Sequence, residues 1–143
     1  MTILDNNLLF SSGQTVTATA DSTNILDFGV AEDLGNDERP LQVFTDWTTA
    51  PVGSSVGTTT IQYSLLCSAT GTSAWTTLYT GPATVYSSVP RYGNPIDLPQ
   101  NCQRFVKLNY AIASGSLTAG VITAGLVLDA DGGQKYYPRG YTA

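Results

Sequence analysis

The residues best able to do chemistry in this chain are its carboxylates, because the sequence contains no histidine. The Ser-His-Asp and Cys-His arrangements of hydrolases are therefore excluded. A pair of carboxylates about 5 to 9.5 Å apart would still permit glycoside hydrolysis. Most of the candidates crowd into residues 27–38, however, which is typical of a solvated acidic loop. We predict that the protein is not an enzyme, and a small glycosidase is kept as a third interpretation. The candidate carboxylates are Asp27, Glu32, Asp33, Asp37, Glu38, Asp46, Asp97, Asp129 and Asp131.

Metal ligands and reactive thiols are equally sparse. The run Asp129-Ala130-Asp131-Gly132-Gly133 resembles the start of a calcium loop, but Gly140 occupies the position of the bidentate glutamate. A turn is the favoured interpretation. The cysteines Cys67 and Cys102 form no CxxC motif, so two reduced thiols are favoured, although a disulfide between them stays open. We expect no metal and no cofactor.

Composition and charge narrow the class of protein further. The chain has 143 residues, of which only 12% are charged, with a formal net charge of −5. The six basic residues form no run, so direct binding of nucleic acid is not expected. No apolar stretch approaches the roughly 20 residues that span a bilayer, so we expect no membrane association and synthesis in a cytoplasm.

Alternating apolar and polar residues predict strands rather than helices. The clearest example is residues 104–114, where Val106, Leu108, Tyr110 and Ile112 share one face. The Pro-rich segment 90–99 is predicted to be a loop or an edge. The predicted strands cover residues 15–20, 24–30, 41–47, 59–68, 75–80, 83–86, 104–114 and 120–129.

The strands must pack as a single all-β domain over residues 1–143, since no repeat or linker marks a boundary. About eight strands with long, Pro-rich connections favour a jelly-roll β-sandwich. The turn at residues 114–116 is expected to join the last two strands as a hairpin-like pair. Residues 1–14 are predicted to be an N-terminal arm, and residues 129–143 a C-terminal tail.

Both ends of the chain carry residues that are typical of protein interfaces. Tyrosine and arginine recur as anchors in protein contacts, and an apolar terminal cluster either covers its own core or inserts into a partner. The alternative for the C-terminal tail is packing over an edge strand of its own sheet. The candidate assembly contacts are Leu8, Leu9, Phe10, Tyr136, Tyr137, Arg139 and Tyr141.

Exposed aromatic residues would support a second interpretation, a carbohydrate- or receptor-binding β-sandwich. For the two tryptophans, the alternation of apolar neighbours favours a place in the core. The candidate platform comprises Trp47, Trp75, Tyr79, Tyr86 and Tyr92.

Several stretches of the sequence resemble the cement (decoration) protein family of Bordetella-phage-type podoviruses. The resemblance covers both ends and the later strands well, and it is looser between residues 40 and 99, where surface loops vary most. The stretches that carry it are residues 3–11, 16–29, 104–110 and 117–129, followed by Tyr137-Pro138-Arg139-Gly140-Tyr141.

The resemblance implies a jelly-roll protein of the virion that sits on the outer surface of an icosahedral head. It implies a homo-oligomer, with a dimer favoured and a trimer possible, whose partner is the major capsid protein. It also implies a structural role: the protein would bridge neighbouring capsid subunits and stabilise the mature shell.

Overall fold

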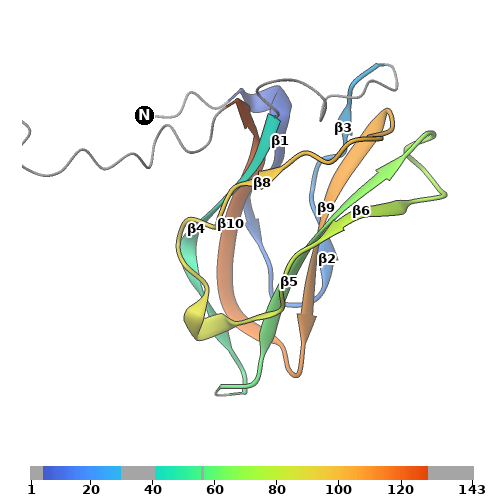
Figure 1. Ribbon diagram of the computed structural model, residues 1–143. Coiled ribbons are helices and arrows are strands. Elements are labelled where there is room, and N and C mark those ends of the chain that lie inside the picture. Colours follow the sequence, from blue (N-terminus) through green and yellow to red (C-terminus); the bar gives the residue numbers. More distant parts are fainter. Residues whose placement is uncertain (1–4, 30–40, 56, 129–143) are drawn as a thin grey trace, which may run out of the picture.

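The computed structural model describes residues 5–29, 41–55 and 57–128, which form two antiparallel β-sheets packed face to face (Figure 1). One sheet has the strand order β1-β10-β4-β8, and the other has the order β2-β9-β5-β6. Strand β3 pairs with β9, and β7 pairs with β5. The strands are β1 (Leu9–Thr15), β2 (Ala20–Asp21), β3 (Leu26–Asp27), β4 (Leu41–Gly53), β5 (Thr60–Ser68), β6 (Thr76–Thr80), β7 (Thr84–Val85), β8 (Ile96–Asp97), β9 (Phe105–Ala113) and β10 (Leu117–Leu128). Two 3₁₀ turns, η1 (Asn6–Leu8) and η2 (Tyr86–Ser88), complete the list.

The pairing is nested from the ends of the chain towards its middle. Strand β1 pairs with β10, β2 and β3 pair with β9, β4 pairs with β8, and β5 pairs with β6. Such a nested ribbon, rolled so that successive strand pairs lie alternately in the two sheets, is a jelly roll. Counting β2 with β3, and β6 with β7, as interrupted strands gives eight. The sequence-based prediction of a jelly-roll β-sandwich of about eight strands is confirmed.

The core lies between the two sheets and follows the period-two pattern. On β9, Val106, Leu108 and Tyr110 are buried, and Ile61 and Leu65 lie beside them on the neighbouring strand β5. The opposite sheet contributes Phe10 from β1, Val43 and Trp47 from β4, and Ile122, Ala124 and Leu126 from β10. Because side chains alternate across a strand, one face of each long strand supplies the core.

Three predictions about connections differ from the structure. Residues 9–14 of the predicted arm belong to β1, which pairs with β10 along the edge of a sheet. Residues 16–19 of the predicted strand 15–20 form the crossing between the two sheets. The turn at residues 114–116 joins strands of opposite sheets, since β9 pairs with β5 and β10 pairs with β4. Sheet membership is decided by long-range packing, which periodicity does not report.

Candidate docking edge

The two long sides of the sandwich are built differently, and the first is tied across by hydrogen bonds. We call residues 9–15 together with 20–27 the closed edge. The backbone N–H of Asn24 donates to the carbonyl of Phe10 at 2.9 Å, and the Gln14 amide donates to the carbonyl of Asp21 at 2.8 Å. Gln14 Oε1 also accepts the backbone N–H of Thr23 at 3.0 Å. These bonds join β1 to the end of β2 in the other sheet and to the segment that follows β2.

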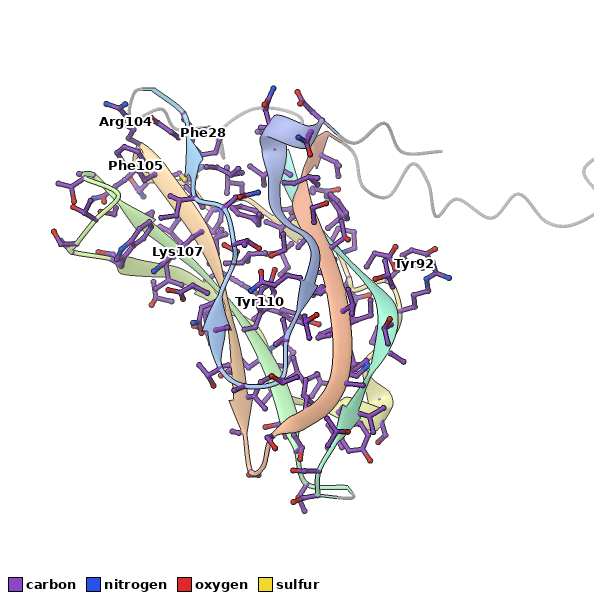
Figure 2. The ribbon with its side chains drawn as sticks, turned by 180° about the vertical axis from the view of Figure 1, so that it is seen from behind. Phe28, Tyr92, Arg104, Phe105, Lys107 and Tyr110 are labelled. Carbon is purple, nitrogen blue, oxygen red and sulfur yellow. The ribbon has the colours of Figure 1, made fainter. Side chains whose placement is uncertain are left out.

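A buried hydroxyl pair extends this polar network into the core. Ser11 Oγ lies 2.8 Å from the hydroxyl of Tyr110 and donates to Gln14 Oε1 at 2.6 Å. The Tyr110 hydroxyl is therefore the donor to Ser11. Burial raises the pKa of Tyr110 well above its usual range, which keeps this hydroxyl protonated. Figure 2 shows Tyr110 between the two sheets.

A second cross-sheet bond lies on the other side of the core. The Trp47 indole Nε1 donates to the hydroxyl of Tyr63 at 2.7 Å, and the Tyr63 ring meets Tyr110 edge to face at 6.1 Å. Burial raises the pKa of Tyr63. The aromatic side chains thus brace the interior, and Trp47 has neither a free N–H nor an exposed face for a ligand.

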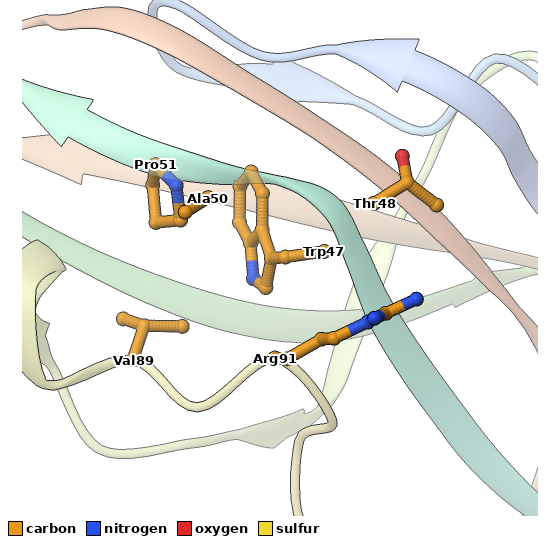
Figure 3. A pocket seen from close by; sticks show the side chains of 6 residues that line it. All are labelled: Trp47, Thr48, Ala50, Pro51, Val89 and Arg91. Atoms are coloured by element: carbon orange, nitrogen blue, oxygen red, sulfur yellow. The ribbon is translucent and has the colours of Figure 1, made fainter.

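Opposite the closed edge, a loop runs along β4 and leaves a pocket. We call residues 45–52 together with 89–93 the open edge. The Trp47 N–H donates to the carbonyl of Arg91 at 2.8 Å, and the Gly93 N–H donates to the carbonyl of Thr45 at 3.0 Å. Beyond Trp47 the loop moves away from β4, and a pocket of about 250 Å³ opens between them (Figure 3). Its lining residues are Trp47, Thr48, Ala50, Pro51, Val89 and Arg91.

Each basic residue of the described segments pairs with an aspartate and lies over an aromatic ring. Arg104 binds Asp27 through two nitrogens, at 2.7 and 2.8 Å, and Lys107 binds Asp21 at 2.6 Å. The rings beneath them belong to Phe105 and Trp75, respectively. Figure 2 shows Arg104 and Phe105 at one end of β9 and Tyr92 on the far side of the molecule.

The third pair, at the open edge, is looser. Arg91 reaches Asp46 through Nε alone, at 3.1 Å, and lies 5.0 Å from the centre of the Tyr92 ring. Its side chain is 63% exposed, compared with 12% for Lys107. The hydrogen bond to Asp46 raises the pKa of Arg91, so its charge is permanent.

The carboxylates of residues 5–29, 41–55 and 57–128 are all engaged in hydrogen bonds. Besides the three ion pairs, Asp5 accepts the N–H of Asn7 and Asp97 accepts the amide of Gln42. Hydrogen bonds from Arg104 and Gly29 lower the pKa of Asp27 to about 2. Partial burial alone would raise the pKa of Asp21, but hydrogen bonds from Lys107 and Asn109 lower it. Neither Asp21 nor Asp27 therefore has the raised pKa of a glycosidase acid.

Among the described residues no group of three histidine, cysteine or carboxylate side chains gathers as a metal site. Cys67 and Cys102 are buried thiols, as the sequence favoured. Within the same segments no helix is long and apolar enough to cross a membrane.

The predicted assembly contacts fall into two groups. Leu9 and Phe10 lie in β1 and are buried in the chain's own core, while Leu8 is half-buried beside it. Phe10 has no exposed surface to offer a partner. Of the two interpretations of this cluster, covering the chain's own core or inserting into a partner, the structure shows the first. Residues Tyr136, Tyr137, Arg139 and Tyr141, and the possible calcium loop at 129–133, lie outside the described residues.

The candidate sugar platform is dispersed over different elements. Trp47 is buried, and Trp75, Tyr79 and Tyr86 are partly covered. Of the five, Tyr92 alone is largely exposed. The pocket residues Pro51, Val89 and Arg91 were not singled out from the sequence as a site. The sequence offered one signal for this site, the dipeptide Arg91-Tyr92. The dipeptide Arg104-Phe105 is of the same kind, and in both the arginine lies over the ring of the aromatic residue that follows it.

Comparison with known proteins gives one family. A family model described as Bbp16 matches residues 10–126, which is well over half of the chain. The match begins in β1 and ends in β10, so it spans the whole jelly roll. No curated protein matches the chain.

Proposed function

The chain belongs to the Bbp16 family, which fits a protein of a Bordetella-type phage, and from that premise we propose that it is a structural protein of the virion. In this proposal it is a capsid decoration protein that binds the outer surface of the icosahedral head and bridges major capsid subunits. The family match over the complete jelly roll is the observation that carries the proposal.

The site chemistry supports a role without catalysis. The described carboxylates are held by cations or amides, and the polar groups that cross the core tie the sheets together. A domain braced in this way suits a protein that must present one fixed surface. We therefore propose that the protein is not an enzyme and that its partner is the major capsid protein.

Decoration would stabilise the mature shell by mass action, because a ligand that prefers one state of the shell shifts the equilibrium towards it. We further propose a homodimer. A dimer that holds two capsid sites gains avidity by a factor of about 10² to 10⁴ without any new contact.

The first experiment is sedimentation of purified protein mixed with undecorated, expanded heads of the same phage. We expect stoichiometric co-sedimentation and heads that resist heating better than bare heads. Failure to co-sediment, with protein that is folded by circular dichroism, would overturn the decoration role.

We propose, as the sequence predicts, that residues of the C-terminal tail contact the capsid. Deletion of residues 134–143 is expected to weaken head binding through loss of Tyr136, Tyr137, Arg139 and Tyr141, with the fold intact. Binding as tight as that of the full chain would remove these residues from the interface. The N-terminal cluster cannot be tested by deletion, because residues 9–12 are part of β1.

A further inference from the structure

We propose that the pocket of the open edge is the docking site for one apolar side chain of an extended, acidic segment of the capsid shell polypeptide. The inference rests on the proposed decoration function and names the surface and the partner chemistry that would serve it.

The size and lining of the pocket select a single side chain. At about 250 Å³ it is smaller than the roughly 300–1,000 Å³ of sites for small organic ligands. Its walls are mainly apolar, from Ala50, Pro51 and Val89. A sugar would need an aromatic face on which to stack, but the Trp47 ring is buried and its N–H is bonded to Tyr63.

The pocket is built on rigid parts of the fold. Gly53 lies so close to the Tyr86 ring that an added Cβ would come within 2.5 Å of it, which fixes η2 against the end of β4. Gly93 lies closer still to the Thr45 side chain, and its N–H bond to the Thr45 carbonyl holds the loop on β4. A preformed pocket loses little entropy when it is filled.

The backbone beside the pocket favours contact through side chains over strand addition. Pro51 has no N–H to donate, and proline within a sheet is confined to edges for this reason. At residues 45–47 the loop 91–93 already covers the edge of β4. A partner segment can therefore lie along the open edge but cannot extend the sheet there.

The guanidinium nitrogens of Arg91 that Asp46 does not use favour a partner with a carboxylate. Arg104 uses two nitrogens on Asp27, and Lys107 is largely covered, so neither offers a free cation. Arg91 uses Nε alone, and within the described residues its two Nη groups make no hydrogen bond. A guanidinium fork that is already oriented over Tyr92 is suited to a carboxylate.

Exposed apolar residues continue the pocket on both sides. Val52 directly follows the pocket residue Pro51 and is 45% exposed. Tyr92, next to Arg91, is 55% exposed. Of the three large hydrophobic residues exposed in the described part of the chain, these two flank the pocket and Ile25 lies at the closed edge. An apolar patch with a charged rim is the usual composition of a protein interface.

The test uses two glutamate substitutions at the open edge and one matched control on another strand. Ala50→Glu places a carboxylate in the pocket, while the matched control Thr77→Glu places one on β6, away from the open edge. Arg91→Glu replaces the guanidinium at the rim with a second carboxylate beside Asp46. Binding of each variant to expanded, undecorated heads is measured by sedimentation, and folding is checked by urea unfolding.

We expect Ala50→Glu and Arg91→Glu to bind heads at least tenfold more weakly than the wild type, with Thr77→Glu within twofold. If wild-type protein binds but the open-edge variants bind equally well, the pocket assignment is wrong and the decoration role stands. If wild-type protein does not bind heads, the decoration role fails, and this assignment fails with it.

A photo-crosslinker at position 50 then identifies the occupant. On decorated heads we expect a crosslink to a major capsid peptide in which an apolar residue lies beside Asp or Glu. A crosslink solely to a second copy of this chain, or to a basic capsid segment, would overturn the proposed partner chemistry.

Discussion

The closed edge and the open edge flank the same core, yet their exposed strand edges are protected in different ways. At the closed edge, Gln14 and Asn24 carry hydrogen bonds from one sheet to the other. At the open edge, a loop covers β4 only as far as Trp47 and leaves an apolar pocket beside Pro51. An unprotected strand edge invites aggregation, and both cross-sheet bonding and proline prevent it.

The contrast separates stability from binding. Polar groups that satisfy one another have nothing left for a partner, so the closed edge contributes to the fold. At the open edge the Nη groups of Arg91 have no hydrogen bond to another described residue, and apolar surface is exposed, so changes there should affect binding more than folding. Substitutions at the two edges test this separation.

The largest effect is expected from Phe10→Ala in β1. Phe10 is completely buried, and truncation of a buried phenylalanine costs about 3 to 5 kcal/mol of folding free energy. Urea unfolding followed by tyrosine and tryptophan fluorescence measures the loss. A loss below about 1 kcal/mol would mean that residues 9–15 behave as a detachable arm in solution.

Removing the hydroxyl of Ser11 is expected to cost less. Ser11→Ala leaves the buried Tyr110 hydroxyl without its partner, which costs about 1 to 3 kcal/mol. In the double variant Ser11→Ala/Tyr110→Phe both polar groups are gone, so part of the loss should be recovered. Simple addition of the two single losses in unfolding experiments would show that the hydroxyls do not interact.

The ion pair of Asp27 with Arg104 predicts a dependence of stability on pH at the closed edge. The pKa of Asp27 is about 2 in the folded protein and about 3.9 in an unfolded chain. Its contribution to stability is therefore present above pH 4 and is lost as the pH falls from 4 towards 2.

Asp27→Asn is expected to lower the urea midpoint at pH 6 and to make the fall between pH 4 and pH 2 shallower. Arg104→Gln removes the other partner and should have the same effect on the slope. Identical slopes for the wild type and both variants would show that the pair is not formed in solution.

The smallest effect on folding is expected at the open edge. Val52→Ser alters an exposed side chain, so the free energy of unfolding should stay within about 0.5 kcal/mol of the wild type. Thermal unfolding provides the measurement. A loss as large as that of Ser11→Ala would mean that Val52 is a core residue and that the two edges do not divide stability from binding.

Much of the fold was predictable from local pattern. Strands β4, β5 and β9 begin within one residue of their predicted starts, and β10 begins three residues before its predicted start. Long alternating segments are easy to predict because their pattern shows directly which face is buried. The edge position of residues 90–99 followed from three prolines. The site was less predictable, since the pocket residues are small, apolar and scattered over two segments.

The sequence by itself determined the all-β class, the inward face of the long strands and the absence of histidine-based catalysis. These depend on residue type and on a period of two, which are local properties. Tertiary structure alone decided that Leu9 and Phe10 are core, that the turn at 114–116 crosses between sheets, and that Arg91 reaches Asp46 through Nε. Each of these depends on which distant strand lies alongside, and pairing between strands far apart in sequence is fixed by the packing of the whole sandwich.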